Sequence, residues 1–367
     1  MAVETRDKPR VIITGASGLI GTRLIDRISN HYSCIALDVR PLPEGSKTPW
    51  FECDLTNDAS TREALKNVKD HYGDTIASVV HLAAYYDFSG EPSPLYQNFT
   101  VAGTEGLLKN LQGFHLEQFL FSSSLLVMKA ASKGQTLKET SPVEAEWDYP
   151  NSKLKAEAVI RDQGGTIPCV ILRIAGVYND RCNSIPIAHQ IKRIYEKDLE
   201  SYFFPGNADH GQAFIHIDDL VECLVKTIDL RGSLDDHELF LIAEPDVLSY
   251  GELQNRIGEL IHGKEWPTIR IPKTIAKAGA WVKEKVAGQE KTFIKPWMVD
   301  LADAHYPVSI ERARQKLGWK PEHRLGSTIT EMIEFLRRDP RAWHEENDLP
   351  MPEHLSAKES KRTGAGA

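Results

Sequence analysis

Long apolar runs, basic charge and paired cysteines are all scarce in this sequence. No stretch approaches the roughly 18 consecutive apolar residues of a membrane span, and the polar start at 1–10 has no apolar signal core. The five cysteines show no C-x-x-C spacing, so neither a disulfide framework nor a metal site is predicted, and a cytoplasmic protein is expected. A formal net charge of −8 argues against nucleic acid as a partner, because phosphate binding needs a concentrated basic face.

The chain is long enough to bury a sizeable core. Its 367 residues are 41% hydrophobic, which suits one large or two coupled globular domains. In the first half, apolar runs alternate with helical patterns, which predicts an α/β protein with a Rossmann-type, doubly wound parallel sheet. The expected strands lie at 11–14, 34–37, 50–55, 77–82, 118–122 and 168–173.

A glycine-spaced turn follows the first apolar run. Gly15 allows a tight turn, Gly18 lets backbone N–H groups approach a pyrophosphate, and Gly21 lets the next helix lie close to its strand. A purely structural turn is the alternative. The residues predicted to bind a dinucleotide at the helix N-terminus are Gly15, Ser17, Gly18, Leu19, Ile20 and Gly21.

Asp38 ends the second expected strand. It stands 23 residues after Gly15, close to the spacing of about 20 at which an acid binds a ribose 2′-hydroxyl. NAD is therefore favoured over NADP as the cofactor. Arg40 follows two residues later and could accept a 2′-phosphate if Asp38 turned aside, so NADP stays open, as does a solvated position for Asp38 at the strand end.

The residues that follow the expected strands are predicted to meet. In a parallel sheet the carboxyl ends of the strands share one edge, and ligands bind there. This edge is the predicted active site. The residues at or just beyond the strand ends are Gly15, Asp38, Asp54, Ala83 and Ser124.

Tyr149 and Lys153 open a helical run that extends to Arg161. Of the eleven tyrosines, only Tyr149 has a lysine four residues later, a spacing that puts both side chains on one helix face. The run lies between the fifth and sixth expected strands, so it begins near the same edge. A chance pairing on the surface is the alternative.

Beyond residue 180 the pattern is less regular. Residues 8–180 are expected to form the NAD-binding domain, which also receives part of 213–243, and 181–340 an interleaved, smaller α/β substrate lobe. Within it, 272–286 is predicted to be a Lys-rich amphipathic helix. Packing on the lobe is the expected role of this helix, and contact with a membrane surface, an apolar substrate or a partner subunit is the alternative. The small, polar tail at 356–367 is predicted to be disordered.

Seven ordered motifs between residues 14 and 173 resemble the extended short-chain dehydrogenase/reductase family, and the resemblance covers nearly the whole chain. This group includes NAD-dependent sugar epimerases and dehydratases. The motifs are T-G-x-x-G-x-x-G at 14–21, D-L at 54–55, H-L-A-A at 81–84, N-x-x-x-x-G-T at 98–104, S-S-S-x-x-V at 122–127, Y-x-x-x-K at 149–153 and L-R at 172–173.

The resemblance implies an NAD-dependent oxidoreductase whose catalytic residues are Ser124, Tyr149 and Lys153. Tyr149 would exchange a proton with the substrate hydroxyl while hydride moves to or from the nicotinamide. Lys153 would favour the phenolate and hold the ribose, and Ser124 would orient the substrate oxygen. A small-molecule substrate and a homodimer are also implied. The remaining cofactor contacts of the family correspond to Asp54, Leu55, Ala83 and Ala84.

Neighbouring polar residues are expected to have structural roles. Ser122 and Ser123 should hydrogen-bond backbone groups at the strand end, and His81 should pack there. His216 and Asp218 are expected to join the two lobes, with Asp218 capping the helix at 218–230.

Two departures from the family bear on the substrate. The acidic pair that follows the catalytic Ser/Thr in dehydratases is Leu125-Leu126 here, so a dehydratase is not expected. Gln212-Ala213 stands where sugar epimerases carry an arginine for the substrate diphosphate. A net dehydrogenase, a 3β-hydroxysteroid-dehydrogenase-like enzyme on a lipid alcohol and a non-catalytic NAD-binding scaffold stay open. So does an NDP-sugar epimerase whose diphosphate is held by Arg181, Lys192 or Arg193.

Overall fold

Seven parallel strands form the central sheet. The computed structural model describes residues 8–87, 90–132, 134–286 and 296–352. The strand order is β12-β8-β7-β5-β1-β2-β3, and every neighbouring pair is parallel. The predicted Rossmann-type sheet is therefore confirmed. Its strands are β1 (Arg10–Thr14), β2 (Ser33–Asp38), β3 (Trp50–Glu52), β5 (Ser78–His81), β7 (Phe119–Ser124), β8 (Cys169–Ile174) and β12 (His237–Ile242).

The inner strands are apolar on both faces. Ile12 and Ile13 of β1 point to opposite sides of the sheet and are both fully buried, as are Val79 and Val80 of β5. A strand buried on both faces reads as a continuous apolar run, and such strands occur in sheets that helices cover on both sides. This explains why the sequence pattern located them closely.

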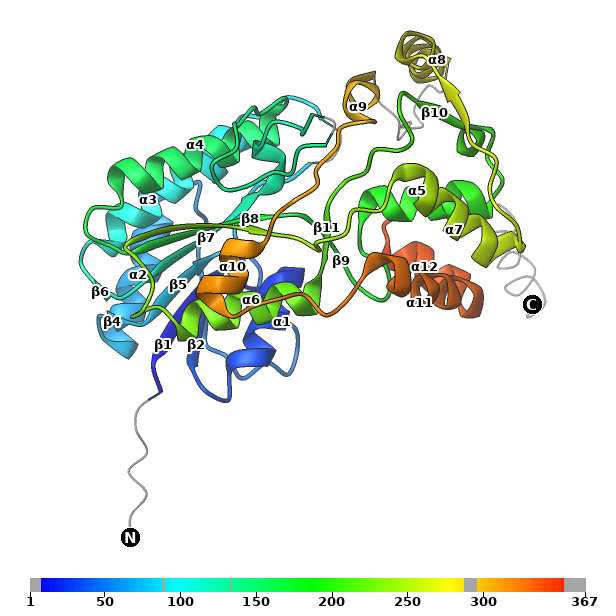
Figure 1. Cartoon of the computed structure of the whole chain (residues 1–367). Coiled ribbons are helices and arrows are strands. Elements are labelled where there is room, and N and C mark those ends of the chain that lie inside the picture. The colour runs from blue at the N-terminus through cyan, green and yellow to red at the C-terminus, as the bar shows by residue number, and fades with distance from the viewer. Residues whose placement is uncertain (1–7, 88–89, 133, 287–295, 353–367) are drawn as a thin grey trace, which may run out of the picture.

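Helices cover both faces of this sheet (Figure 1). On one face α2, α3 and α4 pack side by side, and on the other α1, α6 and α10 do so. The sheet thus separates two buried apolar clusters. A π-helix at Tyr96–Val101 leads directly into α3. The helices are α1 (Leu19–Ile28), α2 (Asp58–Tyr72), α3 (Ala102–Leu111), α4 (Asp148–Gln163), α6 (Ile217–Asp229) and α10 (Glu311–Leu317).

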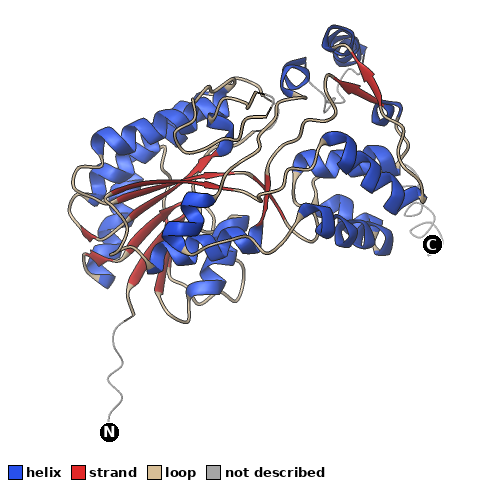
Figure 2. Cartoon of the chain, in the orientation of Figure 1, coloured by secondary structure: helices blue, strands red, loops and turns tan. Residues whose placement is uncertain are grey.

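A helical lobe lies beside the carboxyl edge of the sheet (Figure 2). It has its own apolar core, in which Trp266 and Trp343 are buried. The short strand pair β9 (Gly176–Tyr178) with β11 (Phe214–His216) lies between the lobe and the central sheet, and a second pair, β10 (Phe203–Pro205) with β13 (Ile269–Ile271), lies within the lobe. Its helices are α5 (Ile185–Tyr195), α7 (Tyr250–His262), α8 (Lys273–Val286), α9 (Pro296–Leu301), α11 (Leu325–Arg338) and α12 (Pro340–Glu346).

The structure bears on the predicted cap of α6 and on the predicted C-terminal tail. The cap of α6 is His216, whose ring accepts the Asp218 N–H at 3.3 Å, so the prediction that Asp218 caps this helix was wrong; an imidazole can accept that bond as a carboxylate would. The tail at 356–367 lies outside the described residues. None of the described helices combines the length and apolar character needed to cross a bilayer.

Asp219 binds the C-terminal segment, residues 319–323, to α6. This residue is only 4% exposed, and its two carboxylate oxygens accept the backbone N–H groups of Glu322 at 3.0 Å and His323 at 2.9 Å. Its backbone carbonyl accepts the indole N–H of Trp319 at 2.9 Å. One acidic residue therefore sets the path by which the chain leaves α10 and enters α11.

We expect Asp219→Asn to lower the free energy of unfolding by about 1–3 kcal/mol, because an amide presents N–H groups to one of the two backbone donors and leaves it unsatisfied. Asp218→Asn is the matched control, since the Asp218 side chain is 49% exposed and lies 3.9 Å from Arg23. Urea unfolding measures both variants. Equal losses would contradict the role assigned to Asp219.

Candidate active site

The carboxyl edge of the sheet carries the predicted site residues. Gly15 follows β1, Asp38 ends β2 and Ser124 ends β7. α4 begins with Tyr149 in its first turn, and Lys153 lies one turn further along the same helix. Because the strands are parallel, the structure brings these five residues to a single edge, as the sequence predicted.

The glycine loop is a tight cradle. Gly15 has a φ of +68°, and a Cβ there would lie 2.8 Å from the Ala83 nitrogen. A Cβ at Gly21 would lie 2.6 Å from the Gly15 carbonyl oxygen. Gly18 is the N-cap of α1 and has no side chain that could bind the N–H groups of the first turn. These N–H groups can therefore bind an anion. This cradle fits a pyrophosphate.

Asp38 is oriented by the backbone of the same loop. Its carboxylate accepts the N–H groups of Ser17 at 3.0 Å and Arg40 at 3.1 Å, and the Ser17 hydroxyl donates to the Arg40 carbonyl at 2.7 Å. An ionised carboxylate has about four acceptor positions. Two therefore stay available for the hydroxyl groups of a ribose, and Asp38 fits the role predicted for it.

The other predicted cofactor residues differ in exposure. Asp54 follows β3, and one of its carboxylate oxygens accepts both the N–H of Thr56 at 2.9 Å and its hydroxyl at 2.7 Å. Leu55 and Ala83 are buried in the core cluster between α2 and the sheet. Ala84 lines the cavity described below. Asp54 thus retains one oxygen for a ligand, whereas Leu55 acts mainly in packing.

Tyr149 stands between two aromatic rings. Its ring meets Tyr86 edge-on at 4.7 Å between centroids, and Trp147 lies at 5.5 Å. Burial raises the pKa of the Tyr149 phenol to about 12, and a side-chain hydrogen bond with Ser124 partly opposes this rise. In the protein alone the phenol is therefore protonated at neutral pH. The sequence had not indicated a role for Trp147.

Lys153 is buried beneath Tyr149. Its ammonium donates to the Ser122 carbonyl at 2.5 Å and lies 4.8 Å from the centroid of the Phe121 ring. Burial lowers the pKa of this amine to about 7, while the charge of Glu157 opposes the fall. Burial of the amine therefore works against the positive charge with which Lys153 is expected to support the Tyr149 phenolate.

His81 is a structural residue, as expected. Its Nδ1 lies 2.6 Å from the Thr14 hydroxyl and its Nε2 lies 3.0 Å from the Thr104 hydroxyl. Since Thr104 donates to the Thr100 carbonyl at 2.6 Å, Nε2 must carry the proton. Burial, with help from the charge of Lys153, lowers the pKa of His81 to about 3, so its ring is neutral.

The two serines before Ser124 have different partners. The Ser122 hydroxyl donates to the His81 carbonyl at 3.0 Å, the kind of backbone bond that the sequence predicted. Ser123 instead makes a short hydrogen bond to the carboxylate of Glu157. The backbone role predicted for Ser123 was wrong, because the buried face of α4 places an acid opposite it.

A cavity of about 990 Å³ opens beside Tyr149. Ser124 and Tyr149 lie in its wall, with Ile20 and Ala84 on the side of the glycine loop. The opposite wall is mostly apolar and comes from α5, β10, α8 and α9 of the helical lobe. Among the described residues that line it, the charged side chains are Lys153, Arg193 and Glu200.

The three cations proposed for a diphosphate lie in different places. Arg181 pairs with Glu346 at 2.5 Å and is half exposed, and Lys192 pairs with Glu196 at 2.5 Å. Arg193 reaches the cavity wall.

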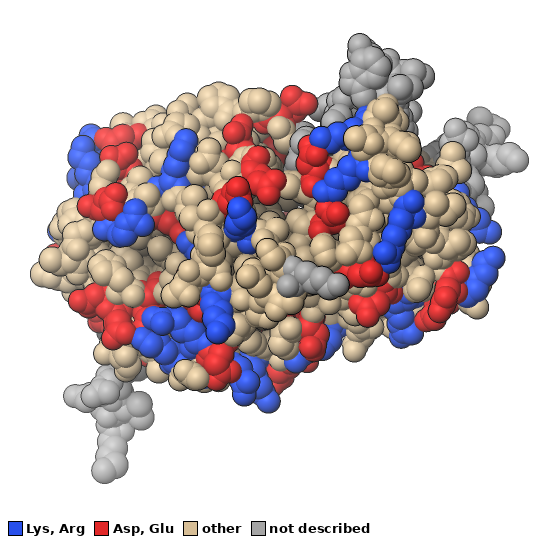
Figure 3. All heavy atoms as spheres, turned by 45° about the horizontal axis from the view of Figure 1, so that its top comes forward, with Lys and Arg blue, Asp and Glu red and all other residues tan. Residues whose placement is uncertain are grey.

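On the face of the molecule drawn in Figure 3, basic and acidic side chains are interspersed.

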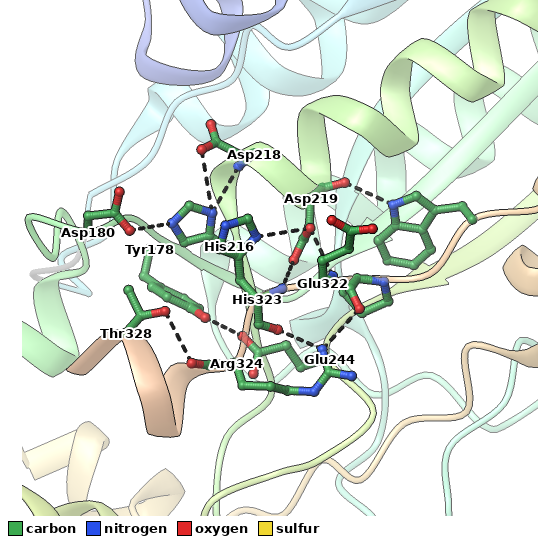
Figure 4. Close-up of polar contacts among 12 residues, drawn as sticks. Tyr178, Asp180, His216, Asp218, Asp219, Glu244, Glu322, His323, Arg324 and Thr328 are labelled. Carbon is green, nitrogen blue, oxygen red and sulfur yellow. Dashed lines mark hydrogen bonds and ion pairs between the residues drawn. The ribbon is translucent and has the colours of Figure 1, made fainter. Parts of the chain in front are cut away.

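A second cluster of titratable side chains lies where α6 meets the C-terminal segment (Figure 4). Ligand atoms of His216, Asp218 and His323 come within 4.8 Å of one another. However, His216 uses Nδ1 to accept a backbone N–H, and its Nε2 lies 3.2 Å from Asp180. The imidazole rings of His216 and His323 stack with their centroids 4.0 Å apart, so the lone pairs of their nitrogens do not converge on one point. The cluster fits the expected joining of the lobes better than a metal centre.

Known proteins resemble the chain over most of its length. The model of the NAD dependent epimerase/dehydratase family matches residues 11–243. Sterol-4-alpha-carboxylate 3-dehydrogenase, decarboxylating, of Candida albicans is 25% identical over 357 residues, which cover 90% of this chain and 98% of that protein. UDP-glucose 4-epimerase of Erwinia amylovora is 26% identical over 266 residues, 63% of this chain and 76% of that one.

A solved structure has the same architecture. UDP-glucuronic acid 4-epimerase of Bacillus cereus, in complex with UDP-glucuronic acid and NAD, superposes with a TM-score of 0.66 at 18% sequence identity. The alignment covers 90% of this chain and 99% of that one. At this level of identity the likeness is one of fold.

Lys153 is expected to titrate far below an ordinary lysine. The neutral amine reacts with acetic anhydride, so labelling of Lys153 should rise as the pH passes about 7. Mass spectrometry of the labelled peptide measures this, with free phenylalanine as an internal standard and the exposed Lys155 of the same helix as a second site. Labelling of Lys153 that rises only near a pH of about 10 would mean that its amine is hydrated.

Proposed function

Because the chain belongs to the NAD dependent epimerase/dehydratase family, we propose that this NAD-dependent enzyme is a dehydrogenase of a sterol-like secondary alcohol. The observation that carries this proposal is the apolar cavity of about 990 Å³ beside Tyr149 and Ser124. Its volume is near the upper end of the range of about 300–1,000 Å³ that is typical of ligand pockets.

The glycine loop and Asp38 would hold the cofactor. The pyrophosphate would lie on the N-terminus of α1, where Gly15, Gly18 and Gly21 leave room for it. Asp38 would bind the ribose hydroxyl groups with its two available acceptor positions. A 2′-phosphate would meet this carboxylate, which supports NAD over NADP. When bound, NAD⁺ accepts a hydride, and its positive charge favours the Tyr149 phenolate.

The proton step would belong to Tyr149. Ser124 shares a hydrogen bond with the phenol and would orient the substrate hydroxyl towards it. Tyr149 would remove the hydroxyl proton as the alcohol becomes a ketone and return it in the opposite direction. Lys153, held by the Ser122 carbonyl, would support the phenolate with its charge and bind the ribose of the cofactor.

The lining of the cavity supports a largely apolar substrate. A nucleotide diphosphate carries two negative charges that need cations or several N–H donors around them. Lys153 would belong to the reacting centre, which leaves Arg193 as the other lysine or arginine among the described lining residues. The sterol-4-alpha-carboxylate 3-dehydrogenase of Candida albicans, 98% of which is covered by the match to this chain, is named for a sterol substrate.

An NDP-sugar epimerase is the second candidate, and Arg193 is the observation that favours it. Its guanidinium group could bind a diphosphate from the wall formed by α5. UDP-glucose 4-epimerase of Erwinia amylovora, at 26% identity, also supports this candidate. An epimerase regenerates its cofactor in each cycle, whereas a dehydrogenase must exchange it.

We expect Asp38→Ala to weaken NAD binding by about tenfold to a hundredfold, because a charged hydrogen-bond acceptor for the ribose is lost. Binding of NADP should change much less. Calorimetric titration of both coenzymes measures the difference. Glu52→Ala is the matched control, since Glu52 is an exposed acid that stands beside Asp38 in the neighbouring strand. An equal loss for both coenzymes would show that Asp38 does not bind the ribose.

A substrate panel tests the proposed reaction. Purified protein with NAD⁺ is expected to produce NADH and a ketone from a 3β-hydroxysteroid such as dehydroepiandrosterone, and not to convert UDP-glucose to its isomer. Tyr149→Phe should lower the turnover by about two to four orders of magnitude, because the proton acceptor is lost, while NAD binding stays within a few-fold.

Opposite results select the second candidate. Conversion of UDP-glucose, together with about one NAD released per chain on denaturation, would replace the dehydrogenase with an epimerase. Turnover that is unchanged in Tyr149→Phe would refute the proton step in both.

A further inference from the structure

Three buried polar side chains lie directly beneath the catalytic face. Arg173 binds Glu157 through two hydrogen bonds, from Nε at 3.0 Å and from Nη2 at 2.7 Å. The same carboxylate accepts a short hydrogen bond from Ser123. Glu157 and Arg173 are each 5% exposed, and Ser123 is 3% exposed. A charge pair is thus held inside the core, with a hydroxyl group as its third member.

The three residues connect the elements that carry the site. Ser123 precedes Ser124 on β7, and Arg173 stands opposite Ser123 in the register of β7 and β8. Glu157 lies one turn after Lys153 on α4. The carboxylate therefore fastens α4 to both strands at the level where Ser124, Tyr149 and Lys153 meet.

Stability alone does not require such a pair. Replacing a buried ion pair with apolar side chains of similar size is often neutral or stabilising, because the desolvation cost of two charges disappears. Even the distal nitrogen of Arg173 is engaged, since Nη1 lies 2.8 Å from the sulfur of Met128. A charge pair at this depth, with a partner for each guanidinium nitrogen, points to a role in the site above it.

Lys153 is the group in the site that a buried carboxylate would affect. An isolated buried ammonium group tends to lose its proton, and the hydrogen-bond acceptor of Lys153 is the uncharged Ser122 carbonyl. His81, which also lies near Lys153, is kept neutral by burial, and Tyr149 is a protonated phenol. Glu157 stands one turn after Lys153 on α4. Its carboxylate binds Ser123, the neighbour on β7 of the residue whose carbonyl binds the amine, so it places a negative charge near Lys153 and favours the protonated amine.

We propose that Glu157 is a positioning residue that holds α4 against β7 and favours the charged form of the Lys153 amine beneath Tyr149. This inference rests on the proposed function for its meaning, because hydride transfer with Tyr149 as the proton acceptor needs a positive charge beside the phenolate. The claim about the charge of Lys153 stands on its own and can be measured in the protein without substrate or cofactor.

The experiment compares the labelling of Lys153 by acetic anhydride in the unmodified full-length protein and in its Glu157→Gln variant. The amide keeps the size of the side chain and removes its charge. We expect the labelling midpoint of Lys153 to fall by about one pH unit, as for a group that loses a nearby opposite charge. Asp162→Asn is the matched control, because Asp162 lies on the same helix with its side chain 65% exposed, and it should leave the midpoint unchanged.

A second variant covers the case in which Glu157→Gln does not fold. Glu157→Gln with Arg173→Met removes both charges together, so no unpaired cation is left in the core. Its midpoint should also fall, by less than in the single variant. A midpoint equal to that of the unmodified protein, in whichever of the two variants folds, would overturn the proposal, since a purely structural tie would change the melting temperature but not the titration of Lys153.

The proposed function fails by a different observation. If no 3β-hydroxysteroid is oxidised while the Lys153 midpoint still depends on Glu157, the positioning role stands and the substrate assignment falls. If the steroid is oxidised and the midpoint does not move in Glu157→Gln, the reaction stands and this inference falls.

Discussion

The packing of α4 against β7 is the contact on which the rest of this protein depends. It brings Tyr149 and Lys153 of the helix to Ser124 of the strand and buries Lys153 against the Ser122 carbonyl. Burial lowers the pKa of the amine and raises that of the phenol, so it disfavours the charged form of both groups in the protein alone. A site of this kind needs opposite charge from its surroundings, and Glu157 lies where it can supply some of it.

The second constraint is that the sheet and the helical lobe supply different walls of the cavity. The edge of the sheet supplies the glycine loop, Asp38 and Ser124, with Tyr149 and Lys153 beside it, whereas most of the far wall of the cavity comes from the lobe. Asp219 fixes the segment that leads into α11 of that lobe. The region proposed for the cofactor and the region proposed for the substrate are thus built by different parts of the chain.

Prediction from the sequence succeeded where the physical signal is local. The strands buried on both faces are continuous apolar runs, the glycine loop must have small residues where backbones meet, and the tyrosine with a lysine four residues later lies on one helix face. Prediction failed where the partner is distant. Ser123 was assigned to the backbone because Glu157 is 34 residues away, and Asp218 was named as a helix cap although the ring of His216 takes that place.

By itself, then, the sequence determined the parallel sheet, the edge that carries the site and the family, because each depends on periodicity or on motifs with fixed spacing. Only the tertiary structure decided which charges are buried together, which of the three cations reaches the cavity, and that the cavity wall is mostly apolar. These properties arise from side chains far apart in the chain, and burial changes their electrostatics only after the elements have packed.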